Sequence, residues 1–412
     1  MDRKVSTAYL KVGMYVSKLD RPWIQTPFLM QGFFIEDECE IYSLVEYCNF
    51  VYIDTELGVN ADMYFDTSHV PGVHSKQCLT TNTQVEAILG TGKKAVDYVD
   101  QSTTIEELPE AKSALEKASE RVEHIVEQDL RNGQLDIVAV KNAVEPILES
   151  MIRNSDAFMW LSKMRHHDVY SYEHSVQNCA LGIAFGRHLG LNKSALNTLA
   201  MGLLLMDIGK IRLPKELLVK SAPLTSAETE IMRKHVAFTV EILRKTKGIS
   251  EHVINIALTH HERYDGSGYP NGLVGVQTPA YGRMAAIINS YDEMITTTPY
   301  RKAISEHNAL QSIYNLRDKF FQQELVEQFM QCMGVYPTGS LVELSSGAVG
   351  TVLSQNTQQK LKPKVLLLLD ENKSPYKKRR VFDLSRQDET PLHILKSLEN
   401  NTYGVDAKQI GL

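Results

Sequence analysis

The chain is 412 residues long, which is enough for two or three domains with buried cores. Hydrophobic residues make up 43% of it and charged residues 23%, so a collagen-like, low-complexity or wholly disordered chain is excluded. The 44 lysines and arginines against 50 aspartates and glutamates give a net charge of −6. Such a mildly acidic chain is not built for general polyanion binding, so we expect no DNA partner. Any phosphate must be held locally, by a metal or a few placed cations.

The N-terminal residues lack the charged, apolar and small-residue order of a signal peptide. The longest aliphatic stretches, 203–206 and 365–369, are far shorter than the ~20 residues that cross a bilayer. We therefore expect no membrane association and a cytoplasmic location. The five cysteines are odd in number and widely spread, which is typical of free thiols in a reducing compartment. They are Cys39, Cys48, Cys78, Cys179 and Cys332.

The first part of the chain predicts a small module followed by a linker and a helical connector. Residues 1–60 alternate short β-type runs with turns and one helix-like patch, which indicates a mixed α/β module. Residues 61–105 begin with a polar segment typical of a linker. In residues 106–157 apolar side chains recur at helical spacing in two runs. This amphipathic pair either forms a homodimer through residues 106–153 or packs onto the next domain, and the sequence leaves both open.

Residues 158–333 predict an almost entirely helical domain. The expected helices are 173–188, 193–206, 227–245, 251–262, 281–296 and 307–331. Thr225 and Glu228 have capping-box spacing at the start of the third. Residues 334–412 form a β-rich appendage, with strands at 341–344, 349–353 and 365–369, and the basic run 377–380 is interpreted as a solvated turn. The predicted fold class is mainly α.

Histidines and aspartates fall on the apolar faces of these predicted helices. His235, for example, shares a stripe with Ile231 and Phe238. Any one such residue is more simply a hydrogen-bonded core side chain. Together they supply imidazoles and carboxylates from five helical segments, as a metal site in a helical bundle requires. The set is His174, Asp207, His235, His260, His261 and Asp292. Nitrogen and oxygen ligands without a thiolate favour Fe or Mn over a structural zinc.

The loop after the histidine pair is the second informative stretch. Residues 266–270 contain two glycines and a proline, which let the backbone turn sharply and approach a ligand closely. Tyr269 could stack on a planar base. A glycine loop alone is usually just a turn, but directly after His260 and His261 it predicts a binding site that includes Gly268 and Tyr269.

These motifs together resemble a known family. The matching residues are His174, 207–210, His235, 260–262, 268–270, Asp292 and 299–301. In order and approximate spacing they are similar to the HD-GYP subgroup of the HD-domain phosphohydrolases, over about residues 158–333. The first ~60 residues resemble a small module often found ahead of such domains. The resemblance implies an HD-type helical bundle with a di- or tri-metal centre that hydrolyses cyclic dinucleotides, above all cyclic di-GMP.

The resemblance also implies a role for each matching residue. One metal would be held by His174, Asp207 and Asp292, and the other by Asp207, His235, His260 and His261. Asp207 would bridge the metals at the catalytic centre, with Lys210 neutralising charge on the scissile phosphate. Gly268, Tyr269 and Arg301 would bind substrate, Arg301 through the fork geometry of its guanidinium.

The chain departs from the family at two positions. The histidine of the family's HD pair is Met206 here, and a thioether serves Fe or Mn poorly. A glutamate that supports a third metal in one family variant is Tyr170 here. We therefore expect two divalent metals, Fe or Mn, or one if the Met206 side is empty.

Two functional hypotheses follow. The first is a metal-dependent phosphodiesterase that opens cyclic di-GMP, 3′3′-cyclic GMP-AMP or both to linear dinucleotide or mononucleotides. The second is a degenerate receptor that binds the cyclic dinucleotide without turnover because Met206 has weakened one metal site. A purely structural helical scaffold is a third reading, and it would bind no metal.

Overall fold

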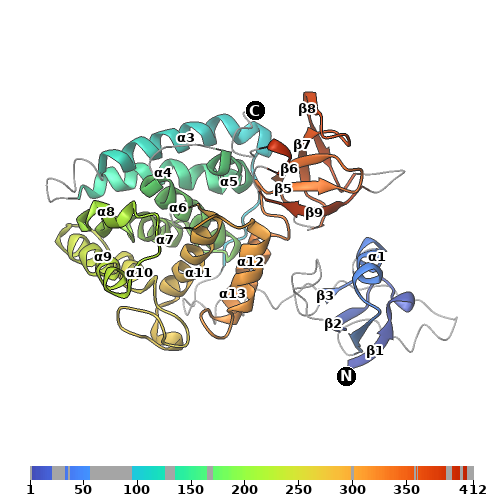
Figure 1. The fold of residues 1–412 in the computed structure, drawn as a ribbon, viewed down its shortest axis with the longest axis horizontal. Helices are drawn as coiled ribbons and strands as arrows, with labels where there is room; N and C mark the ends of the chain where they lie inside the picture. The colour runs from blue at the N-terminus through green and yellow to red at the C-terminus, as the bar shows by residue number, and fades with distance from the viewer. Residues whose placement is uncertain are drawn as a thin grey trace. The chain divides into compact units, whose positions relative to one another are not determined.

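In the computed structural model the chain divides into two compact units, Met1–Thr81 and Asn82–Leu412 (Figure 1). The described residues are 2–20, 33–35, 38–55, 95–125, 135–164, 170–297, 301–356, 359, 361–386, 392–399 and 402–405. Most of the predicted linker, including Pro71 and Gly72, lies outside them, as does Asn132-Gly133.

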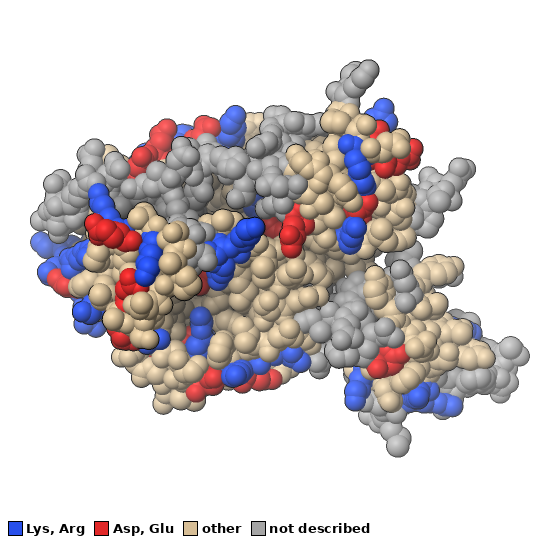
Figure 2. Space-filling model, viewed as in Figure 1, with Lys and Arg blue, Asp and Glu red and all other residues tan. Residues whose placement is uncertain are grey.

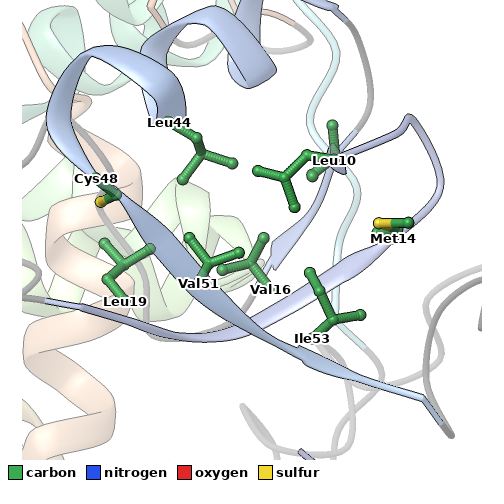
Figure 3. Close-up of a cluster of buried hydrophobic side chains, with 9 residues drawn as sticks. Leu10, Met14, Val16, Leu19, Leu44, Cys48, Val51 and Ile53 are labelled. Carbon is green, nitrogen blue, oxygen red and sulfur yellow. The ribbon is translucent and has the colours of Figure 1, made fainter. Parts of the chain in front are cut away.

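The N-terminal unit is a four-stranded antiparallel sheet with one helix. The strands are β1 (Asp2–Ser6), β2 (Tyr15–Leu19), β3 (Phe33–Phe34) and β4 (Phe50–Asp54), in the order β1-β4-β2-β3, and the helix is α1 (Glu38–Tyr47). Val51 and Ile53 of β4 are fully buried and alternate with partly exposed neighbours, the period of a strand with one covered face. They pack with Val16 and with Leu44 of α1 in one apolar cluster (Figure 3). The predicted small mixed module is the structure observed.

The second unit begins with helices. Their bounds are α3 (Thr104–His124), α4 (Ile137–Arg153), α5 (Ser155–Met164), α6 (Tyr170–His188), α7 (Lys193–Leu205), α8 (Lys215–Leu218), α9 (Ser226–Lys245), α10 (Glu251–Thr259), α11 (Ala280–Ile295), α12 (Glu306–Asn315) and α13 (Gln323–Met333), with a 3-10 turn, η5 (Ile208–Arg212), after α7. The predicted capping box of Thr225 and Glu228 starts α9. The predicted mainly α class is confirmed.

One predicted helix, 307–331, is wrong as a single element. The structure breaks it into α12 and α13, with a turn in which Asp318 has a φ of 59°. Apolar residues on both sides of the break keep helical spacing, so periodicity alone did not reveal it.

The connector helices α3 and α4 pack onto the helical domain. α4 contacts α5, α6 and α7, and its face formed by Val140, Val144 and Ile147 is fully buried. The amphipathic stripe therefore serves packing within the chain, one of the two uses left open by the sequence. A homodimer through residues 106–153 stays a prediction.

The segment Lys193–Arg212, which contains α7 and η5, is apolar and long enough to cross a membrane by length and composition alone. Of its most apolar window, 61% is buried inside the protein. α7 contacts α4, α6 and α10, and Leu199 and Leu203 are buried at these contacts. We interpret it as a core helix of the domain.

The chain closes with a five-stranded antiparallel sheet in the order β8-β7-β6-β5-β9. The strands are β5 (Leu341–Leu344), β6 (Val349–Ser354), β7 (Lys364–Leu369), β8 (Pro375–Asp383) and β9 (Ile394–Leu398). The basic run 377–380, interpreted as a turn, lies instead in edge strand β8, because its pairing with β7 outweighs the low strand propensity of lysine. The sheet is joined to α5 by Asp156, which accepts hydrogen bonds from Thr338 Oγ1 (2.8 Å) and Gln355 N (2.9 Å).

Positive and negative side chains are interspersed over the described surface shown in Figure 2. No single-sign patch dominates that face among the residues described, in keeping with the mixed charge of the sequence.

Candidate metal centre

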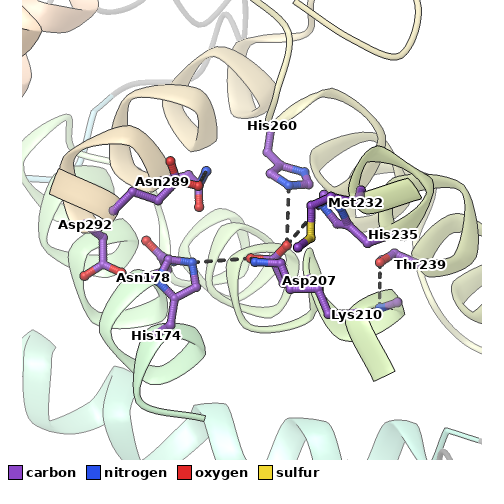
Figure 4. A network of polar contacts seen from close by, with 12 residues as sticks. His174, Asn178, Asp207, Lys210, Met232, His235, Thr239, His260, Asn289 and Asp292 are labelled. Carbon is purple, nitrogen blue, oxygen red and sulfur yellow. Dashed lines mark hydrogen bonds and ion pairs between the residues drawn. The ribbon is translucent and has the colours of Figure 1, made fainter. Parts of the chain in front are cut away.

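The six predicted ligands come from five separate places in the helical domain. They are His174 on α6, Asp207 directly after α7, His235 on α9, His260 and His261 at the end of α10, and Asp292 on α11. The exposed fraction is 9% for Asp207 and 5% or less for His174, His235, His260 and Asp292. Figure 4 shows His174 and Asp292 on one side of Asp207, and His235 and His260 on the other.

Gly209 holds Asp207 against α9. Its backbone N–H donates to Thr239 Oγ1 at 2.9 Å. A Cβ at this position would lie 2.2 Å from the carbonyl oxygen of His235 and 2.5 Å from the Thr239 nitrogen. Only a glycine lets η5 lie directly on the α9 backbone. This close approach brings the Asp207 carboxylate next to the His235 ring.

The Asp207 carboxylate is the centre of the cluster. Its Oδ1 lies 3.2 Å from His235 Nε2 and 3.8 Å from His260 Nε2. Its Oδ2 lies 3.3 Å from His174 Nε2 and 3.0 Å from Lys210 Nζ. The ligand-type atoms of four side chains all lie within 4.8 Å of one another: Asp207, His235, His260 and His261. Each carboxylate oxygen thus faces its own set of nitrogen atoms.

The hydrogen bonds of two histidines fix which ring nitrogen faces Asp207. His235 Nδ1 lies 2.6 Å from the Met232 carbonyl and His260 Nδ1 lies 2.8 Å from the Ala257 carbonyl. A carbonyl only accepts, so each Nδ1 carries the proton and each Nε2 presents a lone pair to the carboxylate. Within the described part of the chain, these Nε2 atoms and Asp207 Oδ1 make no hydrogen bond, while Oδ2 pairs with Lys210. Buried lone pairs that face one another fit a divalent cation between them.

The His174 side of Asp207 has a second group of donors. His174 Nδ1 contacts Asp292 Oδ2, and its Nε2 lies 3.2 Å from Asn178 Nδ2 as well as near Asp207. Apart from this contact, neither oxygen of Asp292 has a polar partner among the hydrogen bonds of the described residues. The structure thus brings all six predicted ligand residues to one buried site.

Burial and charge set the protonation states at the site. Burial opposes a charge on His174, but the carboxylates of Asp292 and Asp207 outweigh it and raise its pKa to about 10. Burial also resists the charge on Asp207, yet the nearby cationic groups hold its pKa well below the usual range. Burial, assisted by the neighbouring imidazoles, lowers the pKa of His260 to about 3 and that of His261 well below its usual value. The last two are therefore neutral near pH 7, the form that binds metals.

The glycine loop is anchored by Glu262, which is only 2% exposed. Its Oε1 accepts from Asn271 N at 2.8 Å and its Oε2 from Leu273 N at 3.0 Å. The Tyr269 ring stacks on His261, with centroids 4.6 Å apart and planes 19° apart. The sequence analysis gave Glu262 no role, and its position directly after the histidine pair was the only available signal.

Four other positions discussed from the sequence lie differently. Lys210 is 27% exposed and borders the site through Asp207. Arg301 is exposed and donates to the Glu293 carbonyl at the end of α11. Met206 is 1% exposed at the C-cap of α7 and offers no nitrogen or oxygen donor. The side chain of Tyr170 lies outside what the structure describes.

The fold and the buried histidine–aspartate cluster define a helical domain of the metal-binding type, and comparison with family models agrees. Residues 152–325 match the HD domain model. Residues 2–139 match a domain of unknown function, DUF3391, and residues 341–405 match a KOW domain associated with HD domains. Over residues 152–325 the chain is therefore similar to the HD-domain family.

Several curated relatives are similar in sequence. A cyclic di-GMP phosphodiesterase of Pseudomonas aeruginosa is 29% identical over 394 residues, 95% of this chain and 91% of the relative. A cyclic di-GMP phosphodiesterase of Thermotoga maritima is 34% identical over 167 residues, 40% of this chain and 45% of the relative. The 3′3′-cGAMP-specific phosphodiesterase 2 of Vibrio cholerae is 34% identical over 158 residues, 38% and 30% of the two chains. Among solved structures, an HDG"Y"P protein from Bdellovibrio bacteriovorus aligns with a TM-score of 0.44 at 16% identity, covering 80% of this chain and 98% of that one.

Proposed function

We propose that this chain is a metal-dependent phosphodiesterase that hydrolyses a cyclic dinucleotide, cyclic di-GMP or 3′3′-cyclic GMP-AMP, to a linear dinucleotide or mononucleotides. The observation that carries the proposal is the buried Asp207 carboxylate, whose two oxygens face histidine nitrogens on opposite sides. A carboxylate placed in this way suits a bridge between two cations. The curated relatives named above act on the same two cyclic dinucleotides.

Two groups of side chains would hold the cations, Fe or Mn in keeping with a nitrogen and oxygen donor set. Asp207, His235, His260 and His261 would hold one, and His174, Asp207 and Asp292 the other. When bound, a pair of divalent cations supplies the charge that activates water and neutralises a phosphodiester.

The remaining residues would position the substrate. Lys210 keeps part of its side chain exposed at the edge of the site, where its ammonium would offset charge on a phosphate oxygen. Tyr269 is fixed by its stack on His261 and, with Gly268 beside it, would line the position of a base. Arg301 would grip a phosphate only after leaving the Glu293 carbonyl.

The test is turnover by the full-length protein loaded with Mn(II) or Fe(II). Both cyclic dinucleotides are supplied in turn, and the products are separated by chromatography. We expect a linear dinucleotide from at least one of them, with kcat reduced by about 10-fold or more in Lys210→Gln. The matched control is Lys215→Gln, which removes an exposed lysine of α8 and should leave turnover unchanged.

No turnover of either substrate by protein that carries both metals would contradict the enzyme proposal. Binding without turnover would favour the receptor hypothesis. In that case Met206→His, which restores an imidazole next to Asp207, should create activity if the missing histidine is the cause.

A further inference from the structure

The two sides of Asp207 are unequally supplied with ligands. The Oδ1 side has three imidazoles, those of His235, His260 and His261. The Oδ2 side has His174 and the carboxylate of Asp292. Met206 adjoins Asp207 in the chain and offers only a thioether, a poor ligand for Mn or Fe. A cation on the His174 side therefore lacks donors that one on the other side has.

Asn178 lies one helical turn after His174 on α6 and is fully buried. Its Nδ2 is 3.2 Å from His174 Nε2, which is itself 3.3 Å from Asp207 Oδ2. Figure 4 shows the asparagine beside His174, on the side of Asp207 away from His235. Its Oδ1 makes no hydrogen bond within the described residues. A buried amide oxygen without a partner is costly and calls for an explanation.

We propose that Asn178 Oδ1 is a ligand of the cation on the His174 side, an inference that rests on the proposed function. The oxygen and nitrogen of an amide are close in size, so a half-turn about the Cβ–Cγ bond puts Oδ1 where Nδ2 lies. The oxygen then lies beside His174 Nε2, which is itself 3.3 Å from Asp207 Oδ2. An amide oxygen is a hard, neutral donor suited to Mn and related ions.

The contact between His174 and Asp292 supports this arrangement. Asp292 Oδ2 contacts His174 Nδ1, so a cation that replaced the Nε2 proton would meet Nε2 on the side of Asp207 and Asn178. Asp292 Oδ1 has no hydrogen-bond partner in the described part of the chain. The side chain of Asn178 would complete that donor set.

A competing role for Asn178 is to position His174 by donating an N–H to its Nε2. Two substitutions separate the roles. Asn178→Leu removes both amide atoms with little change in volume. Asn178→Asp keeps an oxygen and loses the N–H, so a ligand is preserved or strengthened while a donor is lost.

The experiment measures Mn(II) bound to the full-length protein, by isothermal titration and by elemental analysis after dialysis. We expect two Mn(II) per chain for the wild type and one for Asn178→Leu. For Asn178→Asp we expect two, with the weaker site bound at least tenfold more tightly. The control is Asn154→Leu, which removes an equally buried amide that bonds to Ser102 and Ala157 instead, and it should keep two.

Two Mn(II) in Asn178→Leu at wild-type affinity would overturn the inference, as would loss of the weaker site in Asn178→Asp. If Asn178→Leu does not fold, the affinity of Asn178→Asp decides alone, and no gain at the weaker site overturns the inference. A wild type that binds one Mn(II) overturns only this inference. A wild type that binds none overturns the proposed function as well.

Discussion

Buried carboxylates are treated differently in the C-terminal sheet and in the helical domain. In the sheet, Glu343 of β5 lies 2.5 Å from Lys373 Nζ and 3.2 Å from Lys396 Nζ, and Tyr403 donates to it at 3.3 Å. The chain thus neutralises this carboxylate with its own cations. A buried carboxylate whose role is structural is paired with cationic side chains of the same chain.

In the helical domain, Asp207 and Asp292 face imidazoles. Lys210 and the proton favoured by the raised pKa of His174 balance their charge in the metal-free chain. The lone pairs of His235 and His260 are nonetheless turned toward Asp207. Donors arranged in this way suit an added cation. The contrast distinguishes a carboxylate that stabilises the fold, Glu343, from carboxylates that belong to a candidate metal site.

The largest effect is expected from removing the central carboxylate. Asp207→Asn should lower metal content at both positions and reduce turnover by about 10³-fold or more, because the amide cannot bridge two cations. Metal analysis and the dinucleotide assay measure the two effects. The comparison variant Glu343→Gln should cost about 1–3 kcal/mol of unfolding free energy and leave metal content unchanged. Equal loss of metal in both variants would contradict the view that Asp207 belongs to a metal site and Glu343 does not.

The next effect comes from the close approach at Gly209. In Gly209→Ala the new methyl group meets backbone atoms of α9. These atoms cannot move aside as the end of a flexible side chain could. We expect a loss of about 2–4 kcal/mol in unfolding free energy and about a 10²-fold loss of turnover as Asp207 moves. Gly404→Ala in the C-terminal unit meets nothing within 4 Å and should cost only about 1 kcal/mol for its φ of 71°. Similar losses of unfolding free energy in the two variants would show that the close contact of Gly209 with α9 is not what the methyl group disturbs.

A pH effect is expected at Asp156, which joins α5 to the sheet. Burial raises its pKa to about 6, against two hydrogen bonds that lower it. The folded state then holds a proton that the unfolded state releases near pH 4, so this group's contribution to stability falls as pH rises from about 4 to 6. The change amounts to at most about 3 kcal/mol.

Thermal or urea unfolding of wild type and Asp156→Asn measures this contribution. The variant should gain stability relative to wild type as the pH rises from 4 to 7, because its amide does not ionise. A stability difference that stays constant over this range would show that the carboxyl does not titrate there.

The smallest effect is expected at Glu262. Glu262 accepts hydrogen bonds from Asn271 N and Leu273 N, one on each carboxylate oxygen. In Glu262→Gln one of these oxygens becomes an NH2 group, which would face a backbone N–H instead of accepting from it. The glycine loop should loosen, with KM raised about tenfold and kcat changed less. Glu251→Gln, at the exposed start of α10, is the control. A fall in kcat at unchanged KM would mean that Glu262 acts on the chemistry rather than on the loop.

The helices were predictable because they depend on local periodicity. Apolar residues spaced three and four apart fix the buried face of a helix, and His235 shares that face with its apolar neighbours. Convergence of the six ligands was an inference from a resemblance, and the structure supplies the geometry. The role of Glu262 and the contact of Asn178 with His174 depend on tertiary packing, which no spacing reveals.

The misses have physical causes. The break between α12 and α13 depends on a residue with positive φ that carries no glycine signal. Strand β8 has four successive basic residues, and its pairing with β7 holds it in the sheet despite them. Arg301 was assigned by motif position alone, and its role in substrate binding stays a prediction.

The most direct test of the central claim is anomalous X-ray scattering at the manganese absorption edge from crystals of the Mn(II)-loaded protein. The account predicts two peaks that flank the Asp207 carboxylate, one toward His235 and His260 and one toward His174. Absence of any peak beside Asp207, with manganese bound elsewhere or not at all, would contradict it.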